Sequence, residues 1–250
     1  MSQIRKNYEI LSQIYPHLMK KVKYDYWADY LFMLTKKHVG KRAKVLELGA
    51  GNCSLAHHFK KYYKKIIVTD LSFSMLASNK DLLLKTVCCN MLLLPFRKSF
   101  DLIYSSFDSI NYLTKKKDLD KLFSNISYLL SVKGIFTFDV SLVNNSKIHI
   151  KEPVRKGKYK GINYIHKTSY NEKTRIHKNE FEIVTKNNKF YREVHKQKIY
   201  PFFDYFKLLQ KNNLYVVECF KAFTFYDADE NSNRVQFIVK KQSEEIDAVV

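Results

Sequence analysis

A short glycine-rich stretch is the part of this sequence best suited to hold a ligand. Residues 45–54 read VLELGAGNCS and join a run of apolar residues to a segment that favours helix. Glycine tolerates positive φ and lets the backbone approach a ligand closely. The first turn of the following helix would supply unpaired N–H groups for an anionic group. The stretch therefore predicts a cofactor-binding turn between a strand and a helix.

Two kinds of cofactor compete for this turn. A dinucleotide turn follows GxGxxG or GxGxxA, and Ser54 stands at the third position here. A turn that binds S-adenosylmethionine usually follows ExGxGxG, which Glu47, Gly49 and Gly51 match and Cys53 does not. Each pattern fails at one position, so the turn alone leaves a dehydrogenase and a methyltransferase open.

Asp70 is the second candidate ligand-binding residue. It ends a β-rich run, KIIVT, and stands 21 positions after Gly49. A carboxylate at the end of this strand can accept hydrogen bonds from both ribose hydroxyls of either cofactor. We therefore expect Asp70 to bind a ribose.

Three further stretches decide between the cofactors. Residues 70–76 read DLSFSML, residues 90–96 read NMLLLPF and residues 100–103 read FDLI. Together they resemble the series DxSxxML, DMxxLPF and FDLI of class I S-adenosylmethionine-dependent methyltransferases. Residues 108–113 (DSINYL) and 134–140 (GIFTFDV) are similar to a bacterial subgroup of small-molecule methyltransferases, related to amino-sugar and glycine N-methyltransferases. The resemblance extends over nearly the whole chain through Tyr24-x-x-Trp27, His195-x-Gln197 and Ser232-x-Arg234.

This resemblance implies S-adenosylmethionine as the cofactor and gives each residue a role. The glycine turn would line the methionine moiety, Asp70 would hold the ribose, and Leu71 and Met75 would sandwich the adenine. Asn90 stands where the family usually has Asp, so it keeps an acceptor oxygen and loses the charge. The full predicted set of cofactor-binding residues is Glu47, Gly49, Ala50, Gly51, Asp70, Leu71, Met75, Asn90, Met91 and Phe107.

Five residues are candidates for binding the substrate. Asp108 and Asn111 follow the fourth predicted strand, and ligands of open α/β sheets bind at the carboxyl ends of strands. Tyr15, Tyr24 and Trp27 could close over the cofactor, because an aromatic face stabilises a cation by ~0.5–2 kcal/mol. Two structural alternatives stay open, namely capping by Asp108 and plain packing of the aromatic residues.

The sequence does not identify a catalytic base. Methyl transfer from a sulfonium needs alignment of a nucleophile and exclusion of water. A general base is optional for an amine and more useful for a hydroxyl. Asp139, His166 and His195 are candidates, but we assign none of them as catalytic.

The elements that must position these residues alternate between strand and helix five times over residues 44–141. This pattern predicts an α/β fold, a Rossmann-like seven-stranded and mostly parallel sheet. Residues 1–43 would form an N-terminal helical cap broken at Pro16. Residues 142–200 would form an inserted antiparallel β-meander, built from runs at 162–170, 178–185 and 190–200 and acting as a substrate lid. Residues 201–250 would add the final helix and the last two strands.

Composition and charge indicate the kind of partner, the state of the cysteines and the location of the protein. The net charge is +20, but the lysines are spread along all 250 residues, so a small-molecule substrate is preferred to nucleic acid. The four cysteines lack metal-site or CxxC spacing, Cys88 and Cys89 fall in an expected buried strand, and all four indicate reduced thiols. No signal peptide or membrane span is evident, so we expect a cytoplasmic monomer or homodimer without a metal. An RNA methyltransferase and a non-catalytic S-adenosylmethionine-binding protein, the latter suggested by Cys53 and Asn90, remain as alternatives.

Overall fold

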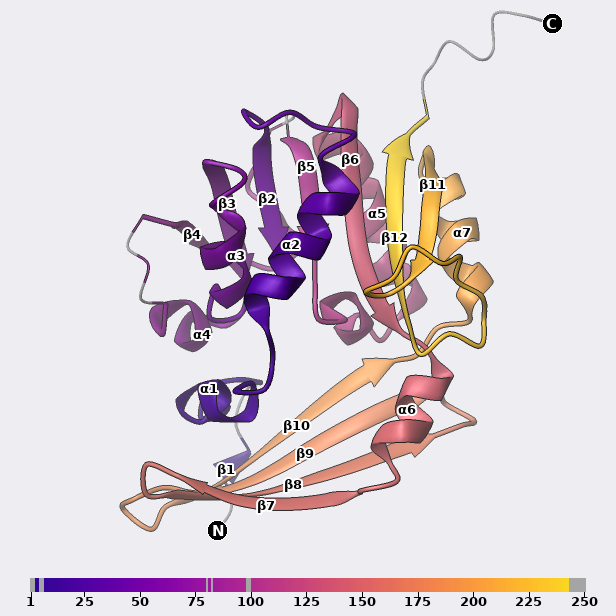
Figure 1. Ribbon diagram of the computed structural model, residues 1–250. Coiled ribbons are helices and arrows are strands. Elements are labelled where there is room, and N and C mark those ends of the chain that lie inside the picture. Colours follow the sequence, from indigo (N-terminus) through magenta and orange to yellow (C-terminus); the bar gives the residue numbers. More distant parts are fainter. Residues whose placement is uncertain (1–2, 5–6, 80, 82, 98–99, 243–250) are drawn as a thin grey trace, which may run out of the picture.

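Seven strands form the central sheet of the protein (Figure 1). The structure is a computed structural model and describes residues 3–4, 7–79, 81, 83–97 and 100–242. The strand order is β11-β12-β6-β5-β2-β3-β4, in which β12 runs antiparallel to β6 and β11 and the other neighbours are parallel. This order confirms the predicted Rossmann-like sheet. The strands are β2 (Lys44–Leu48), β3 (Lys65–Asp70), β4 (Lys85–Cys88), β5 (Phe100–Ser105), β6 (Leu130–Ser141), β11 (Leu214–Lys221) and β12 (Arg234–Lys241).

Helices cover both faces of this sheet. In Figure 1, α2 (Tyr24–Thr35) and α3 (Ser54–Phe59) lie in front, and α5 (Lys116–Leu129) and α7 (Phe202–Lys211) lie behind. Successive side chains of a strand point to opposite faces, so Ile135 packs with the α2–α3 layer and Phe136 with the α5–α7 layer. Burial on both faces explains why these strands read as nearly continuous apolar runs. A short helix, α4 (Phe73–Ala77), follows β3.

The predicted burial of Cys88 and Cys89 is wrong, because β4 is an edge strand. Cys88 and Cys89 were expected in a buried strand, but β4 ends at Cys88 and lies at the border of the sheet. Cys88 is exposed and Cys89 is partly exposed. An edge strand pairs on one side only, which leaves its side chains nearer to solvent.

The N-terminal segment is less helical than predicted. It consists of β1 (Gln3–Ile4), a 3-10 turn (Leu11–Gln13) and the single-turn helix α1 (Tyr15–Leu18) before α2. Pro16 does not break a helix but stands in the first turn of α1, where its missing N–H removes no helical hydrogen bond. The chain before it pairs β1 in parallel with β10 of a second sheet.

The second sheet is the predicted insertion, with two elements that the sequence pattern did not reveal. Its order is β1-β10-β9-β8-β7, with antiparallel pairs among β7–β10. Helix α6 (Val143–His149) and strand β7 (Val154–Tyr159, sequence VRKGKY) were missed, the latter because it lacks alternating apolar residues. The other strands are β8 (Ile162–Asn171), β9 (Ile176–Val184) and β10 (Phe190–Lys198).

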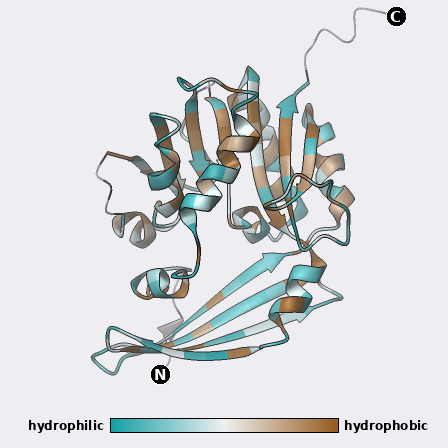
Figure 2. Ribbon diagram, viewed as in Figure 1, coloured by the Kyte–Doolittle hydropathy of each residue, from teal (hydrophilic) through white to brown (hydrophobic). Residues whose placement is uncertain are grey.

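This second sheet lies across the carboxyl ends of the parallel strands, as Figure 1 shows. Hydrophobic residues concentrate in the central sheet and its helices, whereas the second sheet is mainly hydrophilic (Figure 2). The apolar cluster of the second sheet is accordingly small and contains Ile162, Phe181 and Ile183. Within the described residues, no helix is long and apolar enough to cross a membrane.

Candidate active site

The glycine turn after β2 packs tightly against its neighbours. Gly49 and Gly51 have φ values of 69° and 56°, in the left-handed region that glycine favours. A Cβ added to Gly49 would lie 2.8 Å from the Ser109 Cβ, and one added to Gly51 would lie 3.1 Å from the Met75 Cε. The absence of side chains therefore lets the loop backbone form the wall of a cavity.

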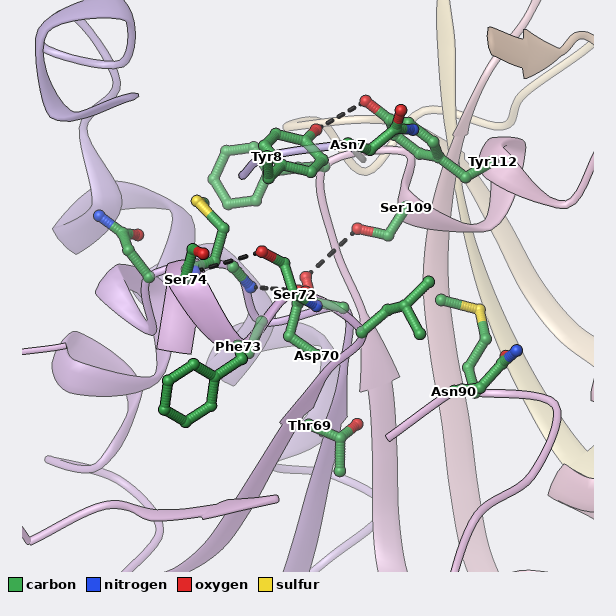
Figure 3. Close-up of a pocket in the computed structure, with 18 of the residues that line it drawn as sticks. Asn7, Tyr8, Thr69, Asp70, Ser72, Phe73, Ser74, Asn90, Ser109 and Tyr112 are labelled. Carbon is green, nitrogen blue, oxygen red and sulfur yellow. Dashed lines mark hydrogen bonds between the residues drawn. The ribbon is translucent and has the colours of Figure 1, made fainter. Parts of the chain in front are cut away.

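This first cavity has a volume of about 810 Å³ and opens at the carboxyl ends of β2, β3 and β5. Figure 3 shows its polar lining, including Asp70, Ser72, Asn90 and Ser109. Nine of the ten residues predicted to bind the cofactor lie on its wall. They are Gly49, Ala50, Gly51, Asp70, Leu71, Met75, Asn90, Met91 and Phe107.

Asp70 is held by two backbone amides. Its Oδ2 accepts the N–H of Gly51 at 2.7 Å, and its Oδ1 accepts the N–H of Ser72 at 2.7 Å. Each oxygen retains a lone pair for a further donor. Burial raises the pKa of this carboxyl above its usual value, although the amide donors act in the opposite direction. Leu71 beside it is 71% exposed, so this apolar wall of the cavity is accessible to a ligand.

Glu47 lies apart from the other predicted cofactor residues. It does not line the cavity, and its side chain is 2% exposed. Strand alternation places Glu47 on the same side as Val45, which packs in the α2–α3 layer. Burial raises its pKa to about 8, and the neighbouring Tyr104 acts in the opposite direction. The structure thus places Glu47 beneath the turn as a buried acid, not against the cavity.

Cys53 and Asn90 are the two departures from the family pattern. The Cys53 side chain is buried in the α2–α3 layer and does not line the cavity, and its φ of 61° keeps the left-handed conformation of a glycine. Asn90 lines the cavity and its Oδ1 accepts the N–H of Leu92 at 2.9 Å. Neither side chain therefore blocks the cavity.

A second cavity, of about 820 Å³, lies between the strand ends and the second sheet. Tyr8, Tyr15, Phe107 and Tyr112 line both cavities, so the two meet there. Of the predicted substrate residues, Tyr24 lies on the first cavity, Trp27 and Asp108 lie on the second, and Tyr15 lies on both. The Trp27 ring packs on Phe107 with a centroid distance of 3.7 Å.

Asn111 lies on neither cavity, although it was predicted to bind substrate. It is fully buried, its Nδ2 donates to the Lys198 carbonyl at 2.8 Å, and its Oδ1 accepts the Ser141 N–H at 3.0 Å. These bonds tie the turn after β5 to β6 and β10. The structure thus gives Asn111 a supporting position.

Asp139, one of the candidate bases, is also buried away from both cavities. It accepts the N–H of Asp108 at 2.9 Å and is ion-paired with Arg234. Burial is the main cause that raises its pKa. Asp139 therefore orients Asp108 and Arg234, which line the second cavity. His166, another candidate, lines this cavity and bonds Asn179 at 2.8 Å.

A buried acid on β10 was missed by the sequence reasoning. Glu193 is 0% exposed and accepts N–H groups from Tyr8 at 2.7 Å, Ile10 at 2.6 Å and Leu11 at 3.0 Å. Its Oε2 also lies 3.2 Å from the His195 Nε2. Burial would raise the pKa of Glu193, but His195 and the amide donors together hold it below its usual value. This carboxylate anchors the N-terminal segment over the two cavities.

A chain of polar contacts leads from Glu193 through His195 to Tyr112 and Tyr8, which lie at the junction of the cavities. The Tyr112 hydroxyl lies 3.4 Å from the His195 Nδ1 and 2.6 Å from the Tyr8 hydroxyl (Figure 3). The signal that could have revealed this group is the spacing of Glu193, His195 and Gln197, since alternate residues share one face of a strand.

Comparisons with known proteins agree with this geometry. Residues 45–134 match the model of a methyltransferase domain family. The chain is 28% identical over 246 residues to "Putative methyltransferase GWCH70_2453" of Geobacillus sp. (strain WCH70), covering 94% of this chain and 99% of the relative. It is 23% identical to "Putative methyltransferase YqeM" of Bacillus subtilis (strain 168), covering 94% of this chain and 97% of the relative.

Solved structures share the fold. An S-adenosylmethionine-dependent methyltransferase from Clostridium acetobutylicum ATCC 824 superimposes with a TM-score of 0.78 at 20% identity, covering 94% of this chain and 99% of that chain. The sugar N-methyltransferase KedS8 from Streptoalloteichus sp ATCC 53650 superimposes with a TM-score of 0.73 at 13% identity, covering 91% of each chain. Residues 45–134 therefore form a methyltransferase domain, and the chain has the fold of S-adenosylmethionine-dependent methyltransferases of known structure, with a cavity at its glycine turn.

Proposed function

We propose that this chain is an S-adenosylmethionine-dependent methyltransferase and that it methylates a nitrogen or oxygen of a small molecule that binds in the second cavity. The observation that carries the proposal is the meeting of the two cavities at Tyr8, Tyr15, Phe107 and Tyr112. A cofactor in the first cavity and an acceptor in the second would approach each other at this junction. Direct alignment of the two reactants is the main requirement of methyl transfer.

The first cavity suits the cofactor in shape and charge. Asp70 offers both carboxylate oxygens to hydroxyl groups, and the glycine turn brings backbone atoms close to the ligand. Among the described residues that line it, none is Lys or Arg, and the aromatic side chains of Tyr15 and Tyr24 are present. Such surroundings favour a cationic sulfonium. When bound, S-adenosylmethionine supplies a methyl group already activated for transfer to a nucleophile.

We further propose His195 as the proton acceptor for the incoming nucleophile. The His195 tautomer that donates Nε2–H to Glu193 presents Nδ1 as the proton acceptor. The Tyr112 hydroxyl is 3.4 Å from that Nδ1, and Tyr112 lines both cavities at their junction. A proton leaving the acceptor would pass to the Tyr112 oxygen as the Tyr112 proton moves to His195, and Glu193 would stabilise the imidazolium.

The position of the second cavity favours a small acceptor over RNA. It lies beneath the second sheet, and its volume of about 820 Å³ is within the range of sites for small ligands, about 300–1,000 Å³. RNA methylation would require a groove in which a base can stack and the backbone can follow a basic surface. The four cysteines are free, which agrees with a cytoplasmic enzyme.

The test is methyl transfer from isotopically labelled S-adenosylmethionine to separate pools of amines, hydroxy compounds and total RNA. Label in a small amine or hydroxy compound supports the proposal, and label confined to RNA refutes it. Calorimetric titration with S-adenosylhomocysteine and NAD measures cofactor choice in the same sample.

Steady-state kinetics with the acceptor so identified test the role of His195. General acid–base catalysis contributes about 10²–10⁴-fold, so kcat should fall by about 100-fold or more in His195→Asn. In Tyr112→Phe, kcat should also fall while KM for the cofactor stays the same. His58→Asn, on α3, is the matched control. A wild-type kcat in His195→Asn would refute this role.

A further inference from the structure

The two cavities differ in charge. The described lining of the second cavity includes five cationic side chains and one carboxylate, Asp108. Asp108 is already engaged by Arg234 at 3.3 Å and by the Ser141 hydroxyl at 2.6 Å. The described lining of the first cavity has no Lys or Arg. The cationic residues of the second cavity are Lys20, Lys21, Arg155, Lys156 and Arg234.

Several of these cations are available to a ligand. Arg155 has an ion-pair partner in Glu152 at 3.5 Å, but both side chains are more than half exposed, and such a pair is weak. Lys20, Lys21 and Lys156 form no ion pair within the part of the chain that the structure describes. Three of the five cations around the cavity therefore have no protein counter-ion among the described residues, and Arg155 has only a weak, exposed one.

Histidines gather at the end of this cavity between α6, β7 and β9. His177 on β9 is 5% exposed and lines the cavity, and its Nδ1 has no hydrogen-bond partner among the described residues. The rings of His149 and His177 lie 6.1 Å apart. A buried polar nitrogen without a partner is costly, and this one belongs to a ring that lines the cavity, so this end of the cavity lacks a hydrogen-bonding partner that a ligand could supply.

We propose that this end of the second cavity, formed by His149, Arg155 and His177, binds an oxyanion carried by the methyl acceptor, a carboxylate or a phosphate. The inference rests on the proposed function of the cavity as the acceptor site. An oxyanion would accept an N–H from His177 and a fork of N–H groups from Arg155. The methyl-accepting atom would lie at the other end, near Tyr8 and Tyr112, where the first cavity begins.

Binding of the oxyanion should be coupled to protonation of His177. Burial, followed by the effect of His149, lowers the pKa of His177 to about 4, so its imidazole is neutral without a ligand. Asp108 and Asn179 oppose this shift and His166 adds to it. A bound anion would favour the imidazolium and raise this pKa, so binding should take up a proton and weaken as the pH rises.

The experiment titrates the full-length protein with inorganic phosphate and with acetate, after saturation with S-adenosylhomocysteine. Calorimetry measures affinity, and imidazole nitrogen NMR follows the protonation of each histidine. We expect an oxyanion to move the His177 signal toward the protonated form. Arg155→Gln and His177→Gln should each weaken binding by about tenfold or more, as loss of a charge-assisted hydrogen bond predicts. Arg42→Gln and His58→Gln, which alter the same residue types outside both cavities, should bind as the wild type does.

The outcomes separate the two proposals. Tighter binding of phosphate than acetate identifies a phosphorylated acceptor, and the reverse identifies a carboxylate. Binding of neither anion, or equal binding by wild type and Arg155→Gln, overturns the oxyanion site while S-adenosylhomocysteine still binds. Because Arg155 is exposed on β7, its variant tests the site even if His177→Gln fails to fold. Loss of S-adenosylhomocysteine binding by the wild type would instead refute the proposed function.

Discussion

Replacing Asp70 by Asn should separate recognition of the ribose from the integrity of the fold. The carboxylate already accepts the N–H groups of Gly51 and Ser72, each at 2.7 Å, and still has lone pairs for two ribose hydroxyls. A hydrogen bond to a charged group contributes about 1.5–3 kcal/mol. Asn keeps one acceptor and loses the charge, so we expect a loss of about 3 kcal/mol, or about 150-fold in Kd for S-adenosylhomocysteine at 25 °C.

Isothermal titration calorimetry measures this change, with Asp29→Asn as the control. Asp29 is exposed on α2 and bonds Lys61 and Tyr62, so its variant should bind S-adenosylhomocysteine like the wild type. The affinity of the wild type should also fall at acid pH. Because burial raises the pKa of Asp70, this loss should begin at a higher pH than for an exposed aspartate. An affinity within threefold of the wild type for a folded Asp70→Asn, roughly 0.7 kcal/mol, would refute the assignment of Asp70 to the ribose.

Three further experiments test the glycine turn, the contact of Glu193 with the N-terminal segment and the wall of the first cavity. Gly51→Ala should destabilise the fold by about 1–2 kcal/mol, because alanine is strained at the positive φ of this position. Calorimetry should show a fall in Tm of about 2–8 °C, and an unchanged Tm would contradict this expectation. Glu193→Gln should speed amide hydrogen exchange at Tyr8 and lower stability by about 2 kcal/mol. Since the pKa of Glu193 is lowered, its stabilising effect is present at neutral pH and is lost as the pH falls through that lowered pKa. S-adenosylhomocysteine should slow alkylation of Cys89, which lines the first cavity, and leave the exposed Cys88 unprotected, as peptide mass spectrometry would show.

The second sheet and the N-terminal segment depend on each other. Glu193 from β10 accepts three backbone N–H groups of residues 8–11, and β1 pairs with the same strand. Tyr8 and Tyr15 are thereby placed over the boundary between the cavities. Under the proposed function, specificity for the acceptor would vary with the inserted sheet while the cofactor turn stays the same.

The sequence by itself determined the parallel sheet and the turn that form the first cavity. The alternation of strands and helices specified the parallel sheet, because strands buried on both faces require apolar runs and crossover helices. The glycine turn, Asp70 and Asn90 follow consecutive strands whose carboxyl ends meet at one edge of the sheet. Local sequence therefore sufficed to collect nine of the predicted cofactor-binding residues around one cavity.

Only the tertiary structure decided which side chains reach the two cavities. Burial under the glycine turn keeps Glu47 out of the first cavity, and close packing makes Asn111 a support for the turn after β5. Tyr8 and Glu193 are 185 positions apart, and their contact depends on how the second sheet folds back over the strand ends. His149 and His177 likewise come from a helix and a strand whose relative placement no periodicity encodes. Local patterns specify elements and their faces, but contacts between distant elements depend on packing that a single sequence does not display.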